Sequence, residues 1–311
     1  MRHLPLVSIL VPIYGVEKYI ERCANSLFNQ SYPNCEFIFV NDCTQDNSIA
    51  ILRKTIEKCF YLRQKVRIIH HEFNRGLGAA RLTGLVNSIG DLVTFVDADD
   101  WVEPDYVEEL VAAMTQHDAD LVISSMEGIS QDKVILNARE HLKQRMCRRV
   151  SCRIWGNLMK RSLMVEHDIW PIEGIDHAED YHVMCKYVSE CKRIVAMRKL
   201  TYHYTIDNDS SYTQNYTVNS IKSTILSLNS TRQYLLTKDP SYVKTINLSA
   251  LEYYKSAHIR HLTDNHEIDE LYKKYLATLP LSFLERLTLY SIQNLPIFIA
   301  KLFTRLLYSQ I

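Results

Sequence analysis

Short apolar runs alternate with longer segments of helical periodicity up to about residue 125, and this alternation restricts the possible folds more than any other feature of the sequence. The apolar runs predict strands at residues 7–11, 36–40, 66–70, 92–96 and 121–124. The segments between them predict helices at residues 17–29, 47–59, 77–88 and 105–117. Continuous apolar runs are typical of strands buried on both faces, and strands that alternate with helices form parallel sheets. The sequence therefore predicts an α/β fold with a parallel sheet covered by helices.

The pattern becomes less regular beyond residue 132. It predicts a helix at residues 179–188, a strand at residues 193–197 and long helical stretches beyond about residue 220. We therefore expect two domains, with the sheet in residues 1–220 and a mainly helical C-terminal extension in residues 221–311.

The residues that follow the predicted strands are candidates for ligand binding, because open sheets bind ligands beyond the carboxyl ends of their strands. These residues are Pro12-Ile13-Tyr14, Asn41-Asp42, Glu72-Phe73-Asn74 and Asp97-Ala98-Asp99-Asp100. The carboxylates of the last group repel one another unless a cation lies between them. Divalent cations often bind one or two carboxylates together with substrate phosphates, so residues 97–100 predict a metal site. A second interpretation stays open, in which Asp99 or Asp100 caps the helix after Pro104.

Several classes of function are disfavoured. A dinucleotide-binding fold would place Gly-x-Gly-x-x-Gly after the first strand, where Gly15 stands alone. The chain has 36 basic and 36 acidic residues, so no net charge attracts nucleic acid. The eight cysteines are irregularly spaced without a Cys-x-x-Cys pair, and His70-His71 has no partner at zinc-ligand spacing. We expect reduced thiols without a chemical role.

Five motifs follow one another along residues 5–210. They are Val-Ser-Ile-Leu-Val-Pro-Ile-Tyr at 7–14, Val-Asn-Asp at 40–42, Asn74-x-Gly76 with Ala80-Arg81, Asp97-x-Asp99-Asp100-Trp101, and Glu179-Asp180. In this order they resemble the family 2 glycosyltransferases of bacterial polysaccharide synthesis. The resemblance implies the GT-A fold, a nucleoside-diphosphate sugar as donor with uridine as the default base, and a saccharide or lipid-linked glycan as acceptor. It also implies a divalent cation, Mn²⁺ or Mg²⁺, and inversion at the anomeric carbon.

The resemblance assigns the nucleotide-sugar and metal sites to particular residues. It implies that Pro12, Tyr14 and Asp42 surround the base, and that Asn74 and Arg81 lie along the ribose and the diphosphate. Tyrosine can stack on a base, and arginine offers paired donors to phosphate. The metal and the diphosphate would be held by Asp99 and Asp97, with His203 as a further ligand. A structural role for His203 stays open, because a lone histidine is more often structural.

The acceptor side and the catalytic base are expected further along the chain. The resemblance places Trp155, Asn157 and Lys160 on the acceptor side, and makes Asp180 the base, with Glu179 as its neighbour. An alternative is that Glu179 and Asp180 form the first turn of a helix, where acidic residues interact favourably with the helix dipole. The two interpretations are compatible, since a helix start holds a base rigidly.

Two positions depart from the family pattern. Cys43 follows Asp42 where many members have glycine, and cysteine adopts a positive φ less readily, so we expect the turn to differ locally. Leu82 follows Arg81 where asparagine is usual, which affects the fine geometry of the donor pocket. Neither change removes a charged group that the mechanism requires.

The sequence also leads to expectations about location and about alternative functions. The first residues lack the apolar core of a secretory leader, so we expect a cytoplasmic protein located at the inner face of the cell membrane. Residues 295–307 predict an apolar helix that either rests on a membrane or packs on the domain. A nucleotidyltransferase is disfavoured because no Gly-rich basic loop is present near the first strand. A catalytically inactive family member that binds nucleotide sugars or acts as a scaffold remains the second alternative.

Overall fold

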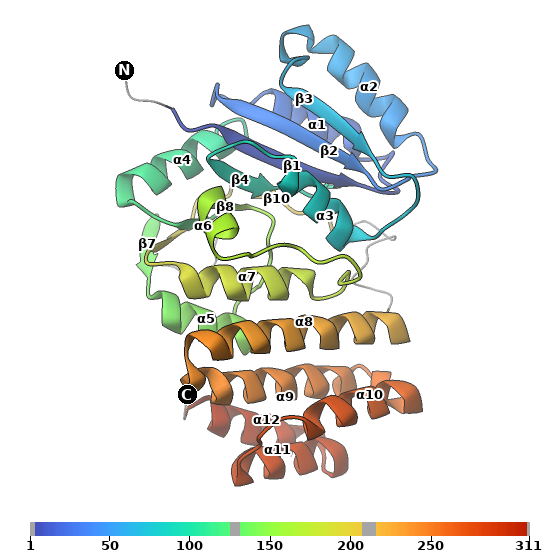
Figure 1. Ribbon diagram of the computed structural model, residues 1–311, viewed down its shortest axis with the longest axis vertical. Coiled ribbons are helices and arrows are strands. Elements are labelled where there is room, and N and C mark those ends of the chain that lie inside the picture. Colours follow the sequence, from blue (N-terminus) through green and yellow to red (C-terminus); the bar gives the residue numbers. More distant parts are fainter. Residues whose placement is uncertain (1–3, 125–130, 207–215, 310–311) are drawn as a thin grey trace. The chain divides into compact units, whose positions relative to one another are not determined.

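The computed structural model describes residues 4–124, 131–206 and 216–309 (Figure 1). The chain forms two compact units. The sheet unit comprises residues from 1–138, 153–176 and 190–211, and the helical unit those from 139–152, 177–189 and 212–311. The units therefore do not coincide with a division at residue 220, because two earlier segments belong to the helical unit.

The sheet unit contains an eight-stranded mixed sheet in the order β3-β2-β1-β4-β8-β6-β9-β7. Its strands are β1 (Val7–Ile13), β2 (Cys35–Asn41), β3 (Val66–His70), β4 (Leu92–Phe95), β6 (Leu121–Ile123), β7 (Lys133–Leu136), β8 (Asn157–Lys160) and β9 (Ile194–Met197). The helices of this unit are α1 (Ile20–Phe28), α2 (Ser48–Lys58), η1 (Phe60–Leu62), α3 (Leu77–Val86), α4 (Tyr106–His117) and α6 (Arg161–Glu166). A separate antiparallel pair joins β5 (Trp101–Val102) to β10 (Tyr202–His203).

The predicted α/β class is confirmed, as are the six predicted strands and the four predicted helices before residue 118, within a few residues at their ends. The sheet is not wholly parallel, however. Strand β8 lies between β4 and β6 and runs antiparallel to both, and β7 runs antiparallel to β9. The first four strands in the sheet order, β3-β2-β1-β4, are the parallel part that the sequence predicted.

Strand β1 is apolar along nearly its whole length because helices cover both faces. Its residues Val7, Ile9, Val11 and Ile13 belong to the core that includes α1 and α4. On the other face, Leu10 lies against Gly84 of α3. A strand enclosed in this way cannot show apolar–polar alternation.

The helical unit consists of α5 (Ala138–Met146), α7 (Glu179–Glu190) and five further helices from the C-terminal part of the chain. These are α8 (Val218–Lys238), α9 (Val243–Ile259), α10 (His266–Ala277), α11 (Phe283–Asn294) and α12 (Ile297–Tyr308), with short turns η2 (Pro240–Tyr242) and η3 (Leu262–Asp264). Helix α9 packs against α8, α10, α11 and α12. Thr217 with Ser220 and Ser282 with Glu285 form capping boxes that begin α8 and α11.

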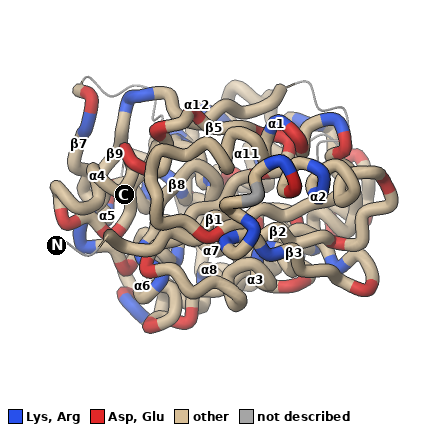
Figure 2. Tube along the Cα trace, turned by 90° about the horizontal axis from the view of Figure 1, so that it is seen from above, with Lys and Arg blue, Asp and Glu red and all other residues tan. Residues whose placement is uncertain are grey.

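Charged residues of both signs are interspersed along the trace (Figure 2), in agreement with the equal numbers of basic and acidic residues. None of the helices in the described part of the chain combines the length and apolar character that crossing a bilayer requires.

Two glycines of α3 provide a matched test of this packing. A Cβ on Gly78 would lie 2.5 Å from the carbonyl oxygen of Ile172 and 2.6 Å from that of Ile175, both backbone atoms. A Cβ on Gly84 would meet its nearest atom, the Leu10 Cβ, at 3.5 Å, which is ordinary contact. We expect Gly78→Ala to lower the free energy of unfolding by about 1–3 kcal/mol, and Gly84→Ala to raise it by about 0.5–1 kcal/mol. Urea denaturation of both variants measures the difference, and equal effects would contradict the packing described.

Candidate functional site

The parallel register brings three strand ends to one edge of the sheet. Ile13 is paired with Asn41, and Asn41 with His70. The next residues along the chain, Tyr14, Asp42 and His71, therefore follow neighbouring strands at the same level. Tyr14 is 54% exposed and Pro12 is half-buried, so a planar ligand can reach the tyrosine ring.

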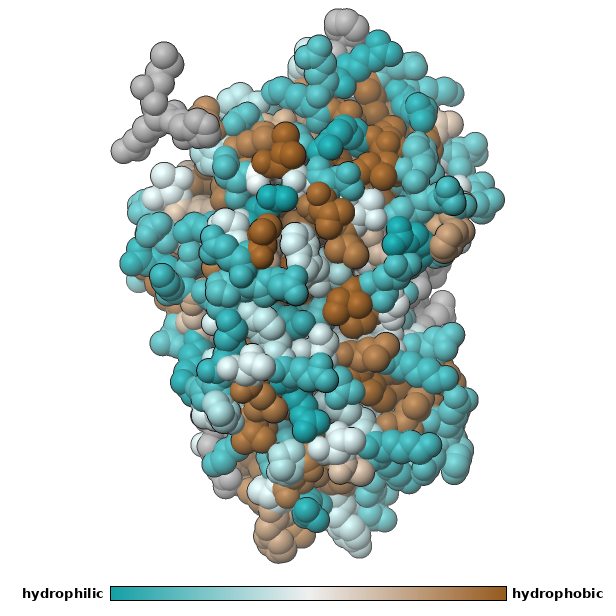
Figure 3. All heavy atoms as spheres, in the orientation of Figure 1, coloured by the Kyte–Doolittle hydropathy of each residue, from teal (hydrophilic) through white to brown (hydrophobic). Residues whose placement is uncertain are grey.

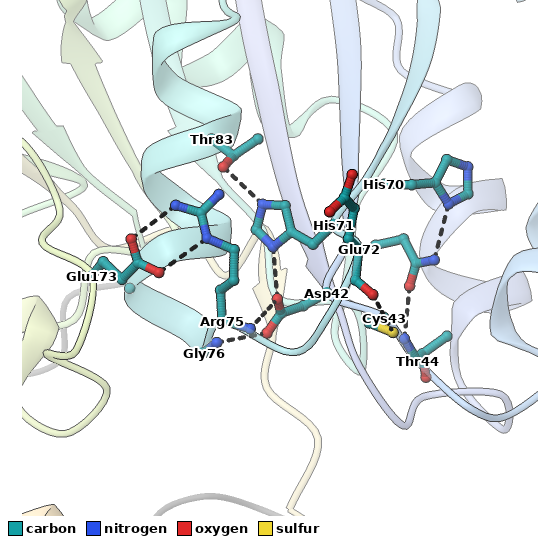
Figure 4. Close-up of polar contacts among 12 residues, drawn as sticks. Asp42, Cys43, Thr44, His70, His71, Glu72, Arg75, Gly76, Thr83 and Glu173 are labelled. Carbon is teal, nitrogen blue, oxygen red and sulfur yellow. Dashed lines mark hydrogen bonds and ion pairs between the residues drawn. The ribbon is translucent and has the colours of Figure 1, made fainter.

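The buried carboxylate of Asp42 is the centre of a hydrogen-bond network at this edge (Figure 4). Its Oδ1 accepts from the backbone N–H of Arg75 (2.8 Å) and lies 2.7 Å from the Nδ1 of His71. Its Oδ2 accepts from the backbone N–H of Gly76 (2.8 Å). Asp42 thus joins the end of β2 to the turn before α3. Its predicted contact with a nucleotide base stays a prediction, and three of its acceptor positions are already used within the protein.

The turn after Asp42 keeps the backbone conformation that glycine would favour. Cys43 has a φ of 58°, in the left-handed region. The N–H of Thr44 donates to Asn41 Oδ1 (2.9 Å), and the Cys43 thiol donates to the Glu72 carbonyl (3.6 Å). A non-glycine residue is therefore held in the left-handed conformation, with these two hydrogen bonds around it, and the expected difference from the family's turn stays a prediction.

The turn before α3 carries Asn74 and a basic residue that the sequence did not single out. Asn74 is exposed at the edge. Next to it, Arg75 makes a bidentate ion pair with Glu173, at 3.0 Å from Nε to Oε1 and 2.8 Å from Nη2 to Oε2 (Figure 4). The pKa of Glu173 is lowered mainly by this hydrogen bond. A nearby carboxylate, Asp176, accepts from the N–H of Gly78 (3.0 Å), so residues 173–176 are held against the start of α3.

The acidic segment after β4 contains one half-buried ion pair and one fully buried carboxyl group. Arg81 Nη2 donates to Asp97 Oδ1 (2.9 Å), and the Arg81 side chain is almost completely buried. The carbonyl of Asp99 accepts from Arg22 and Thr205, and its side chain is half-buried. Burial, together with repulsion from Asp97 and Asp99, raises the pKa of Asp100 to about 7. Hydrogen bonds from the Tyr202 hydroxyl (2.6 Å) and the Thr205 N–H (2.8 Å) act in the opposite direction.

Oxygen ligands for a hard cation are therefore present at the end of β4. No group of three His, Cys, Asp or Glu side chains in the described ranges is arranged to hold a metal. Asp97 and Asp99 fit a cation whose other ligands come from a substrate diphosphate. His203 is engaged elsewhere: its Nε2 lies 2.7 Å from Glu103 Oε1, and its ring stacks on Trp101 with centroids 3.7 Å apart. These contacts favour its structural role.

An aromatic stack connects the acidic segment to Trp155. Tyr202, whose hydroxyl donates to Asp100, stacks on Trp155 with ring centroids 4.7 Å apart. Tyr204 stacks on the same indole at 5.4 Å, and the Arg153 guanidinium lies 4.6 Å from the ring centroid. Sequence reasoning noticed Trp155 but did not identify Tyr202, which has no motif of its own.

The other two residues predicted on the acceptor side have structural contacts. Asn157 is fully buried, and its amide donates to the carbonyls of Arg153 and Ile154. Lys160 is paired with Leu92, the first residue of β4, and its ammonium binds Asp120 at 2.9 Å. Strand β4 ends at Phe95, three residues after Leu92, and a strand rises about 3.3 Å per residue, so Lys160 lies at the opposite end of β4, roughly 10 Å from the level of Phe95. The structure does not bring Lys160 to the edge where the other predicted residues of the sheet unit lie.

The predicted base belongs to the helical unit. Glu179 and Asp180 are the first two residues of α7, and both are half-buried. They begin the helix as expected, so the dipole interpretation holds alongside any catalytic one. Adjacent helical residues point about 100° apart, so the two carboxylates face different directions.

Comparison with known proteins assigns the fold and the family. The sequence profile of Glycosyl transferase family 2 matches residues 8–165, which span the strand-end residues and the acidic segment. The chain belongs to glycosyl transferase family 2.

Two curated relatives illustrate the range of the family. EpsH of Bacillus subtilis strain 168, described as a glycosyltransferase, is 33% identical over 226 residues, which are 68% of this chain and 64% of EpsH. Glycosyltransferase GlyA of Streptococcus pneumoniae serotype 4 is 30% identical over 225 residues, 66% of this chain and 31% of GlyA. The chain therefore spans less than two thirds of either relative.

Solved structures share the fold at low sequence identity. Residues 1–349 of Staphylococcus aureus TarS, in complex with UDP-GlcNAc, superpose with a TM-score of 0.73 at 18% identity, covering 96% of this chain and 90% of that one. The mannosyltransferase PcManGT of Pyrobaculum calidifontis, in complex with GDP-Man and Mn²⁺, gives a TM-score of 0.58 at 15% identity, covering 98% and 86%. These similarities confirm the predicted GT-A fold with a helical C-terminal region.

Proposed function

We propose that the protein transfers a sugar from a nucleoside-diphosphate sugar, with UDP as the nucleotide, to an acceptor hydroxyl with inversion, in the synthesis of a cell-surface glycan. The observation that carries this proposal is the Arg81–Asp97 pair beside Asp99 at the carboxyl end of β4. It places a guanidinium, which can bind phosphate, beside carboxylate oxygens, which can bind a cation. Support for UDP comes from TarS, whose structure contains UDP-GlcNAc.

Each strand-end residue has a defined role in this proposal. Tyr14 stacks on the base, and the remaining acceptor position of Asp42 takes a base N–H. Asn74 contacts the ribose, and Arg81 stabilises the charge that develops on the departing diphosphate. A divalent cation, Mn²⁺ or Mg²⁺, held by Asp97 and Asp99 supplies further positive charge to the diphosphate when bound. Support for Mn²⁺ comes from PcManGT, whose structure contains it.

Asp180 is the proposed base. It accepts the proton of the acceptor hydroxyl while that oxygen attacks the anomeric carbon from the face opposite the diphosphate, through an oxocarbenium-like transition state. A single displacement of this kind inverts the configuration. Trp155 is the proposed acceptor-side aromatic residue, and the exposed ring of Tyr204 that stacks on it offers a surface for an acceptor sugar.

We expect Asp99→Asn to abolish the Mn²⁺-dependent part of UDP binding and to reduce turnover by at least about a hundredfold, because it removes a charged oxygen ligand while keeping the shape. Titration calorimetry of UDP with and without Mn²⁺ measures the first effect, and UDP release from a panel of sugar nucleotides measures the second. Asp118→Asn is the control, since Asp118 is an exposed aspartate of the same unit. Mn²⁺-independent activity of the unmodified protein would contradict the proposal. Binding of a sugar nucleotide without any turnover would favour the inactive family member.

We expect Asp180→Asn to lower kcat by about a hundredfold or more with little change in UDP affinity, because the amide cannot accept the proton. Glu179→Gln should lower kcat by a smaller factor. Steady-state kinetics of both variants, with UDP affinity measured separately, test this assignment. If Glu179→Gln lost turnover and Asp180→Asn kept it, the two roles would be exchanged.

We further propose that α11 and α12 place the protein on an anionic membrane, at the inner face of the cell membrane, near a lipid-linked acceptor. Phe283 of α11 is 78% exposed and Phe298 of α12 is 68% exposed. Leu302 and Leu306 are exposed at helical spacing after Phe298, whereas Ala300 and Thr304 are buried. Apolar side chains also reach the surface of the helical unit in Figure 3. The sequence from Arg286 to Ile311 has three basic residues and no acidic one, which suits anionic lipid.

Replacing Phe298 and Leu302 together with serine should weaken binding to phosphatidylglycerol vesicles at least tenfold, because buried apolar area drives such docking. The control is Leu226→Ser, since Leu226 is an exposed leucine of α8. Vesicle sedimentation measures the binding, with phosphatidylcholine vesicles as the neutral comparison. Equal binding by all variants would refute membrane docking. A concentration-dependent dimer that the double variant loses would assign this face to a second copy of the chain.

A further inference from the structure

We infer that His71 is a positioning residue for nucleotide binding: it fixes the Asp42 carboxylate and the rotation of α3 together. This inference rests on the proposed function. His71 follows β3, is buried, and lies between two polar groups (Figure 4). Its Nδ1 is 2.7 Å from Asp42 Oδ1, and its Nε2 is 2.8 Å from Thr83 Oγ1. Because a carboxylate has only acceptors to offer, Nδ1 carries the hydrogen, and the Thr83 hydroxyl then donates to Nε2 in the neutral ring.

The network reaches α3 at two points. Asp42 binds the N–H groups of Arg75 and Gly76 directly before the helix, and Thr83 lies two turns further on. The two points are the turn at Gly76, directly before the first residue of α3, and Thr83 within the helix. Hydrogen bonds at two points along α3 oppose its rotation about its axis.

Arg81 depends on this rotation. It lies on α3, two residues before Thr83, and its guanidinium donates to Asp97 on a different strand end. The turn before α3 depends on Gly76, because its φ of 90° and ψ of 167° suit only glycine. A Cβ on Gly76 would also clash with the Asp176 carboxylate. Releasing His71 therefore disturbs Asp42 at the base end and Arg81 at the phosphate end.

Two substitutions separate positioning from simple space-filling. In His71→Asn the amide nitrogen can occupy the place of Nδ1 and still donate to Asp42, whereas the longer His71→Gln places its amide near Nε2 and loses that donor. We expect His71→Gln and His71→Ala to weaken UDP binding at least tenfold, and His71→Asn to stay within about threefold of the unmodified protein.

Thr83, at the α3 end of the network, can be tested with a second matched pair of substitutions. Thr83→Val removes the hydroxyl that holds Nε2 and should weaken UDP binding several-fold. Thr83→Ser retains the hydroxyl, so its UDP affinity should stay close to that of the unmodified protein. Thr55→Val is the control, since Thr55 is a buried threonine of α2 whose hydroxyl donates to Ile51 within its own helix.

Titration calorimetry with UDP and Mn²⁺ gives the affinities, and thermal unfolding of each variant reports on the fold. Rescue by asparagine but not by glutamine, at similar Tm, supports the inference. Equal UDP affinity in His71→Asn and His71→Gln, or affinities that follow Tm alone across the series, would overturn it. Failure of the unmodified protein to bind UDP would instead refute the proposed function, so the two failures are distinguishable.

Discussion

The parallel register of β1, β2 and β3 is the constraint on which the candidate site depends. Pairing of Ile13 with Asn41, and of Asn41 with His70, ends three strands at one level. Both faces of β1 are buried, so a slip of one residue would turn each side chain towards the wrong layer of helices. The same packing that makes the core therefore brings Tyr14, Asp42 and His71 to one edge.

The sequence predicted those parts of the fold that have a local signal. Each strand from β1 to β4 is an apolar run between helices, so its position and the parallel sheet followed from periodicity. Strand β8 has no such signal: residues Asn157–Lys160 were singled out for an acceptor-side role and not as a strand, and their antiparallel insertion between β4 and β6 is decided by tertiary pairing. Strands β5 and β10 have two residues each, too few for any period to appear.

The same distinction separates the site residues that were predicted from those that were not. Asp42, Asp97 and Asp99 could be proposed from the sequence because their place after a strand is visible along the chain. Arg75 and Tyr202 were missed because their partners, Glu173 and Asp100, are 98 and 102 residues away in sequence. His71 was considered as a metal ligand and set aside, but its role comes from Asp42 and Thr83, which only the fold brings to its two ring nitrogens.

The two ends of the edge differ in electrostatic balance, and this difference gives the proposed donor its orientation. At the β2 end, the Asp42 charge is surrounded by two backbone N–H groups and an imidazole, so it is stabilised within the protein. At the β4 end, Asp97, Asp99 and Asp100 face two guanidinium groups, Arg81 on the Asp97 carboxylate and Arg22 on the Asp99 carbonyl. The raised pKa of Asp100, to about 7, reflects burial and the remaining repulsion. A bound cation would therefore stabilise the carboxylates at the β4 end, whereas the Asp42 carboxylate at the β2 end is already stabilised by its own partners. A ligand with an uncharged base at one end and a cation-bound diphosphate at the other fits this edge in one direction, with its base at β1 and β2 and its phosphates at β4.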